Sequence, residues 1–270
     1  MAPQTAAATR RVGRWRRDAQ FQGPLLESAL PVIKLLLLAL SGAKLGKLFA
    51  SGGTMLISLV VYAFVFGWRY AAGFIALLFA HEMGHYLAAR QRGLAVGLPT
   101  FIPFVGAWID LKEQPRDVET EAYVAFAGPL VGTVAAIACY LAADDGGPRW
   151  LMAVAYSGFF LNLFNLLPLA PLDGGRITAV LSPRIWFAGV PLLGALFLWH
   201  PNPMLLLIAL IAAPQLVKAW RYDPKAAENE RYYAISARRR FEYLALYFGL
   251  AAYLAFMAYR THSLVSPGAS

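Results

Sequence analysis

Two histidines and a glutamate lie within five residues of an otherwise apolar stretch, Leu78-Phe-Ala-His81-Glu82-Met-Gly-His85-Tyr-Leu-Ala88. On a helix, side chains four residues apart lie one turn above each other on the same face. His81 and His85 can therefore bind one metal ion through their imidazole nitrogens. Glu82 projects about 100° away around the helix, where it can take a proton from a water molecule activated by that ion. The pattern H-E-x-x-H thus predicts a metal centre that activates water.

A catalytic zinc ion usually takes three protein ligands and keeps one position open for water. The two remaining histidines, His200 and His262, fall on the opposite side of the membrane in the topology described below. The sequence therefore favours a carboxylate, and Asp173 in the segment 165–175 (NLLPLAPLDGG) is the main candidate. Two prolines end a helix there and two glycines permit tight turns, which predicts non-helical backbone that lines a wet cavity. A plain surface turn is the alternative, because P-x-D-G is a common turn sequence.

The composition is that of a protein embedded in a membrane. Of the 270 residues, 59% are hydrophobic and only 14% are charged. A soluble domain of this length could not bury so much apolar surface. The single cysteine, Cys139, excludes an intrachain disulfide. The net charge is +9. In a membrane protein, such an excess of Lys and Arg usually marks cytoplasmic loops and contact with anionic lipid. No basic-aromatic module that would bind nucleic acid is found, so a nucleic-acid partner is not expected.

Seven apolar stretches can cross a bilayer, which predicts an all-α polytopic membrane protein with six to seven transmembrane helices. They are Phe49–Trp68, Ala71–Ala89, Glu121–Ala143, Trp150–Leu167, Ile185–Trp199, Met204–Trp220 and Phe241–Tyr259. The fifth and sixth are short and contain Pro191 and Pro214, so kinked or partly re-entrant helices are the alternative for this pair.

Three parts follow from these stretches and from the charges. Residues 1–48 are a basic cytoplasmic tail with an interfacial helix, residues 49–181 are the catalytic transmembrane core, and residues 182–270 hold C-terminal transmembrane helices and a basic cytoplasmic loop. A cleaved signal peptide is the alternative for the N-terminal part, because Ser41-Gly-Ala43 is small enough for a cleavage site.

The basic residues are distributed very unevenly over the two sides of this topology. Seven spans leave 3 of the 24 Lys and Arg residues on one side, namely Arg69, Arg149 and Arg260, and 21 on the other. An excess of Lys and Arg marks the cytoplasmic side. The count predicts a multi-pass protein with its N-terminus inside and its C-terminus outside, and the expected location is the plasma membrane. Since the second span runs inward, the metal site lies toward the cytoplasm.

The motifs together resemble those of the site-2 protease family of intramembrane zinc metalloproteases, in a compact form without a PDZ or other soluble domain. The resemblance covers residues 74–177. It rests on His81-Glu-Met-Gly-His85, on Ala127-Gly-Pro129, and on Asn165-x-x-Pro-x-x-Pro-Leu-Asp173-Gly.

The resemblance implies a complete catalytic apparatus. His81, His85 and Asp173 would ligate Zn2+, Glu82 would be the catalytic base, and Asn165 would stabilise the oxyanion or the substrate. The implied reaction is hydrolysis of peptide bonds within transmembrane segments of membrane-protein or peptide substrates, in a lipid bilayer. The oligomeric state stays open.

The family fold also implies a membrane-associated β-hairpin after the metal-binding helix, here residues 98–111. This region has strand-forming residues and two prolines, which suits an edge or re-entrant ribbon. An edge could pair with an unwound substrate by strand addition, and the candidate substrate-binding residues are Phe104, Val105, Gly106 and Ala107. A plain amphipathic loop on the membrane is the alternative.

Other functions share some of these features. A prenyl-protein protease would share H-E-x-x-H but should supply a glutamate as third ligand. A proton- or metal-coupled transporter would also keep ionisable groups in its spans, but normally shows inverted repeats that this sequence lacks. The alternative to an enzyme is a non-catalytic or transport protein that uses the same metal-binding membrane core. The presence of all three ligands and the base favours the enzyme.

Overall fold

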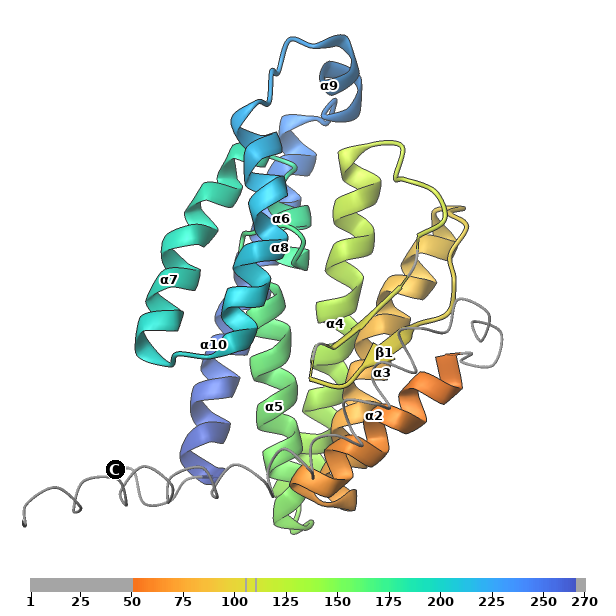
Figure 1. The fold of residues 1–270 in the computed structure, drawn as a ribbon, viewed down its shortest axis with the longest axis vertical. Coiled ribbons are helices and arrows are strands. Elements are labelled where there is room, and N and C mark those ends of the chain that lie inside the picture. Colours follow the sequence, from red (N-terminus) through yellow and green to blue (C-terminus); the bar gives the residue numbers. More distant parts are fainter. Residues whose placement is uncertain (1–50, 105, 110, 266–270) are drawn as a thin grey trace, which may run out of the picture. The chain divides into compact units, whose positions relative to one another are not determined.

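The computed structural model describes residues 51–104, 106–109 and 111–265, which form a group of helices with one small hairpin (Figure 1). The predicted tail and interfacial helix over residues 1–48 lie outside the described residues. The predicted helical class and the hairpin are confirmed. The elements are α2 (Ser51–Phe66), α3 (Trp68–Gln91), β1 (Thr100–Ile102), β2 (Gly106–Trp108), α4 (Val118–Asp144), α5 (Arg149–Asn165), α6 (Asp173–Thr178), the 3-10 helix η1 (Pro183–Ala188), α7 (Gly189–Trp199), α8 (Pro203–Trp220), α9 (Ala227–Tyr232) and α10 (Ala237–Val265).

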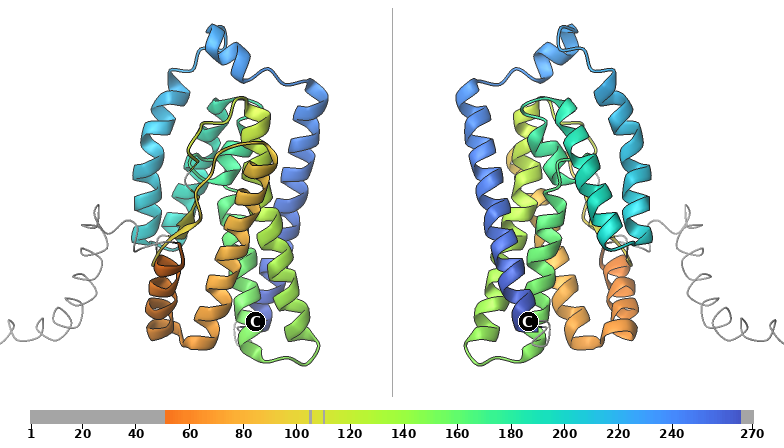
Figure 2. Two further views of the ribbon diagram at one scale, coloured as in Figure 1. Left: turned by 90° about the vertical axis from the view of Figure 1, so that its right-hand side faces the viewer. Right: turned by 90° about the vertical axis from the view of Figure 1, so that its left-hand side faces the viewer.

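Within the described part of the chain, three helices are long and apolar enough to cross a membrane, namely α4, α8 and α10. Helix α3 has 24 residues, but the ionisable groups of the metal site and two arginines make it too polar by composition alone. Helix α7 has 11 residues and is therefore about 16 Å long, against a hydrocarbon core of about 30 Å. Figure 2 shows the α7–α8 turn stopping short of the level that the α4–α5 turn reaches. Six to seven crossings therefore remain a prediction.

Close contact between α3 and α4 depends on small residues. A Cβ atom at Gly84 would lie 2.4 Å from the carbonyl oxygen of Ala127, so only glycine lets the two backbones meet at this point. Alanines 125, 136 and 155 of α4 and α5 are fully buried in one hydrophobic cluster, to which α10 also contributes. Small residues are common where membrane helices approach closely. This close packing places the α3 histidines against α4.

The segment after α5 brings Asp173 back toward α3. Helix α5 ends at Asn165, and Pro168 follows where a helix could not continue. The Tyr247 hydroxyl donates to the Leu166 carbonyl (2.6 Å) and ties this turn to α10. The sequence prediction that Gly174 and Gly175 serve tight turns is wrong, because both lie inside the short helix α6. Their Cβ atoms would lie 2.1 Å from the carbonyl oxygen of Leu166 and 2.2 Å from the amide nitrogen of Ala170, respectively, so glycine is needed there for close packing.

The hairpin lies against α2 and α3. Strands β1 and β2 are antiparallel, with Phe101 opposite Ala107. The turn between them has Phe104 at φ 61°, and β2 begins with Gly106 at φ 123°. Phe101 is fully buried in a cluster that includes Leu78, one turn before the metal-binding pair. The packing of Phe101 thus holds the hairpin against the turn of α3 that comes just before His81.

Candidate metal centre

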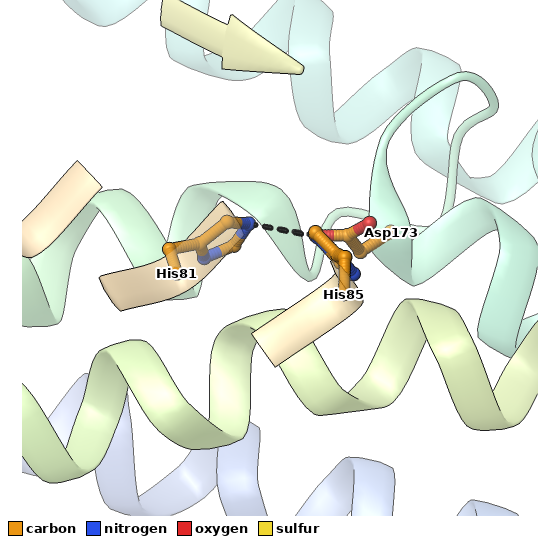
Figure 3. A group of neighbouring side chains, drawn as sticks. All are labelled: His81, His85 and Asp173. Carbon is orange, nitrogen blue, oxygen red and sulfur yellow. Dashed lines mark hydrogen bonds and ion pairs between the residues drawn. The ribbon is translucent and has the colours of Figure 1, made fainter. Parts of the chain in front are cut away.

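Three metal-ligating side chains converge inside the helices. The His81 and His85 Nε2 atoms are 3.1 Å apart, and Asp173 Oδ2 lies 3.2 Å from the first and 3.3 Å from the second. All three residues are buried. Figure 3 shows the two histidines on α3 and Asp173 reaching them from α6. The structure therefore brings together the three residues predicted as ligands.

Hydrogen bonds on the other ring nitrogens fix which atoms carry protons. His81 Nδ1 lies 2.8 Å from Asn162 Oδ1, and the Asn162 amide nitrogen is committed to the Gly158 carbonyl at 2.7 Å. His85 Nδ1 lies 2.8 Å from the Val124 carbonyl oxygen. Both partners are acceptors, so Nδ1–H donates in each neutral ring and each Nε2 carries a bare lone pair.

This donor set fits a zinc ion. Two imidazole lone pairs and a carboxylate oxygen at 3.1–3.3 Å from one another repel unless a cation lies among them. Donor atoms bound to a tetrahedral zinc ion at about 2.0–2.1 Å are about 3.3 Å apart. Histidine ligands commonly donate their second ring N–H to a carbonyl or other acceptor, as both do here. The three residues thus have both the spacing and the tautomers that zinc requires.

Two glycines of α4 leave room for the site. A Cβ atom at Gly128 would lie 2.2 Å from His85 Nε2, and one at Gly132 would lie 2.4 Å from Asn162 Oδ1. The Ala127-Gly-Pro129 motif therefore has a direct steric role, because any side chain at residue 128 would displace the imidazole.

Glu82 lies beside the ligands and is 5% exposed. Its carboxylate is within electrostatic range of both histidines, Asp173 and Arg176. Within the described residues it accepts no hydrogen bond, so its oxygen atoms are available to a water molecule. This is the position expected of a general base next to a metal-activated water.

The role of Asn162 as the partner of His81 could not be foreseen from the motifs, whose one asparagine, Asn165, is expected at the oxyanion or the substrate. Asn165 ends α5, and its amide nitrogen donates to the Leu161 carbonyl one turn earlier at 3.2 Å. Its predicted role at the oxyanion stays a prediction. One feature of the sequence could have identified Asn162. It is an amide inside the apolar stretch 150–167, and a buried amide needs a hydrogen-bond partner.

The hairpin residues proposed for substrate binding pack against α2 and α3, and their connection with the metal ligands runs through α3. Phe104 is half exposed, and its N–H donates to the Tyr62 hydroxyl at 3.0 Å. Ala107 packs against the cluster around Leu78. Val105 lies outside the described residues. Substrate binding by Phe104, Gly106 and Ala107 stays a prediction.

Replacement of Asn162 by alanine should weaken zinc binding about 10- to 100-fold, the usual effect of losing such an orienting partner. The reason is that His81 loses the acceptor that fixes its tautomer and ring orientation. Competition with a chromogenic chelator on purified protein measures the affinity. Asn162→Asp keeps an acceptor and should restore most of it, while Asn165→Ala should leave it unchanged. Zinc affinity at the unmodified level in Asn162→Ala would contradict the assignment.

Comparison with known proteins gives a family match over α3 and α4 and several related proteins. Residues 69–145 match the model for peptidase family M50. The putative zinc metalloprotease Rip3 of Mycobacterium tuberculosis is 36% identical over 129 residues, which cover 43% of this chain and 32% of the relative. A zinc metalloprotease of Methanocaldococcus jannaschii is 30% identical over 110 residues, which cover 38% and 32%. The probable zinc metalloprotease EGY1, chloroplastic, of Arabidopsis thaliana is 31% identical over 153 residues, which cover 39% and 28%.

The family match includes part of the metal site but not all of it. The chain spans about a third of the length of these relatives. The family match contains His81, Glu82, His85 and Gly128, whereas Asp173 lies beyond it and reaches the site through the fold. The resemblance predicted from the motifs is confirmed, since both the H-E-x-x-H helix and the glycine-proline motif lie inside the segment that matches peptidase family M50.

Proposed function

We propose that this chain is an intramembrane zinc metalloprotease that hydrolyses peptide bonds within transmembrane segments of other proteins. The observation that carries the proposal is the buried group of three lone-pair donors with a free carboxylate beside it. The zinc metalloprotease names of the relatives support the same chemistry and the same cofactor, Zn2+.

The residues divide the chemistry among themselves. When bound, a zinc ion supplies a Lewis acid that activates water and polarises a carbonyl group. His81, His85 and Asp173 would hold it. Glu82 accepts the proton of the attacking water and delivers it to the leaving amine. Asn165 would donate a hydrogen bond to the oxygen that becomes negative in the tetrahedral state.

The apolar surroundings strengthen these electrostatic interactions because little water competes with them. They also require the substrate helix to unwind, since its internal hydrogen bonds would otherwise shield the bond that is cut. We infer that the strand edge near Phe104, Gly106 and Ala107 pairs with the unwound segment. The exposure of Phe104 supports this inference.

A non-catalytic or transport protein built on the same metal-binding core is the second candidate. Such a protein would have no need for a base, and loss of Glu82 would be tolerated. The buried Glu82 carboxylate, which has no hydrogen-bond or ion-pair partner among the described residues, is costly to retain without a task, and this favours the enzyme.

Glu82→Gln should abolish peptide cleavage and leave zinc binding intact, because an amide cannot accept the proton of water. The measurement is cleavage of a synthetic transmembrane peptide by purified protein, together with zinc content. Glu113→Gln, the same change at an exposed loop position, is the matched control and should cleave normally. Chelation of zinc should stop cleavage by both active forms. Cleavage by Glu82→Gln at the unmodified rate would exclude the mechanism.

We also propose that the site faces the cytoplasm, in the plasma membrane. The two ends of α4 support this orientation. The acidic pair Asp144-Asp145 closes one end, whereas Glu119 at the other end pairs with Arg239 of the basic segment 218–240 (2.6 Å).

Cysteines introduced singly at positions 5, 146 and 266, after replacement of Cys139, test this orientation. An impermeant thiol reagent applied to intact cells should label positions 146 and 266 but not position 5. Labelling of position 5 as well would mean that the N-terminal apolar stretch crosses the bilayer. Labelling of position 5 alone would reverse the orientation.

A further inference from the structure

A cavity that contains none of the metal ligands lies beside α9. Figure 1 shows α9 at one end of the group of helices. The volume of the cavity is about 400 Å3. Two stretches of the chain line it: residues 181–184 at the start of η1, and residues 222–240, which run from the end of α8 through α9 to the start of α10. Its lining includes Ser182, Arg184, Tyr222, Glu230, Tyr233 and Arg240.

The two arginines of this cavity are bound to neutral groups only. Arg184 donates to the Tyr222 carbonyl (3.1 Å), and Arg240 donates to the carbonyls of Leu181 and Tyr233 (3.3 and 3.2 Å). Within the described residues, neither forms an ion pair with a carboxylate. A guanidinium group has five N–H donors, so most of those on Arg184 and Arg240 remain available. Carbonyl oxygens orient both groups without cancelling their charge.

Neighbouring arginines show the opposite arrangement. Arg238 pairs with Glu242 (2.9 Å), and Arg239 pairs with both Glu119 and Glu242. The only acidic residue among those lining the cavity is Glu230, which is exposed and forms no ion pair within the described part of the chain. The cavity therefore keeps a net positive charge even when Glu230 is counted.

The surroundings of this cavity suit a membrane surface. Helix α8 ends at Trp220, which is 79% exposed and meets the ring of Phe187 at 6.1 Å. Exposed aromatic residues at helix ends are typical of the headgroup level. Basic pockets beside membrane helices bind lipid phosphates on the cytoplasmic side. The position thus favours a lipid headgroup over a ligand from bulk water.

We propose that this cavity binds the phosphate group of an anionic phospholipid, held by Arg184 and Arg240 with the Ser182 hydroxyl beside them. Two guanidinium groups with free N–H donors match phosphate oxygens in charge and geometry. A free phosphate ion presents the same chemistry, and the test separates the two sources.

Hydrogen bonds connect this cavity with the metal centre by way of α9. Tyr233 lines the cavity, and the adjacent Tyr232 hydroxyl donates to Glu121 (2.5 Å). Glu121 also accepts from Arg176 of α6 (3.3 Å), three residues after Asp173. Burial and the Glu121 carboxylate raise the pKa of Tyr232, so its hydroxyl stays protonated as the donor. A bound headgroup would hold α9 on this network and so stabilise α6.

The test measures lipid binding to the purified full-length chain and does not depend on its protease activity. The probes are phosphatidylglycerol, phosphatidylcholine and inorganic phosphate, added to protein in neutral detergent. Affinity is read by native mass spectrometry and by the shift in melting temperature. Phosphatidylglycerol should bind and stabilise, and phosphatidylcholine should not. Phosphate at millimolar concentration giving an equal shift would assign the cavity to a free anion and overturn the lipid proposal.

Matched variants separate this cavity from general surface charge. Arg184→Gln and Arg240→Gln should each weaken phosphatidylglycerol binding about tenfold, as expected for loss of a hydrogen bond to a charged group. Arg221→Gln removes the same charge from an exposed residue outside the cavity lining and should have no effect. Glu230→Gln leaves both arginines in place and should strengthen binding. Equal losses in Arg221→Gln, or weaker binding in Glu230→Gln, would overturn the proposal.

Discussion

The structure depends on the repulsion among three lone pairs that are held together away from water. His81 and His85 present their Nε2 atoms to Asp173, at distances that become favourable when a metal ion or a proton lies among them. Asn162 and the Val124 carbonyl prevent either ring from relieving this repulsion by exchanging tautomers. The ligands are therefore arranged for a metal before it binds, which is the usual condition for a site that must be precise.

The surrounding helices serve this arrangement by approaching closely. Glycines at 84, 128 and 132 bring α3, α4 and α5 into contact and leave space for the imidazole and the amide. Those at 174 and 175 let α6 lie on the turn that follows α5, which sets the position of Asp173. Each of these positions has no room for a methyl group, so the geometry of the metal centre is limited by backbone packing.

Sequence reasoning could predict which side chains come together where local geometry decides the outcome. The spacing of His81, Glu82 and His85 determines their faces on any helix, and the ligand count then pointed to Asp173. It failed where the result depends on how helices cross. Asn162 is an ordinary amide until α5 meets α3, and the glycines of α6 resemble turn residues until the packing is seen. The number of membrane crossings also depends on packing, because α3 and α7 do not qualify by length and composition alone.

The central claim is that Asp173 completes the metal site, and zinc affinity tests it most directly. Competition titration of purified protein should show one tightly bound zinc ion in the unmodified chain. Loss of that binding is expected in Asp173→Ala, because two histidines alone leave the ion without its charged ligand. Asp145→Ala, at the exposed α4–α5 turn, should bind zinc normally. Full zinc occupancy with unchanged affinity in Asp173→Ala would contradict the account.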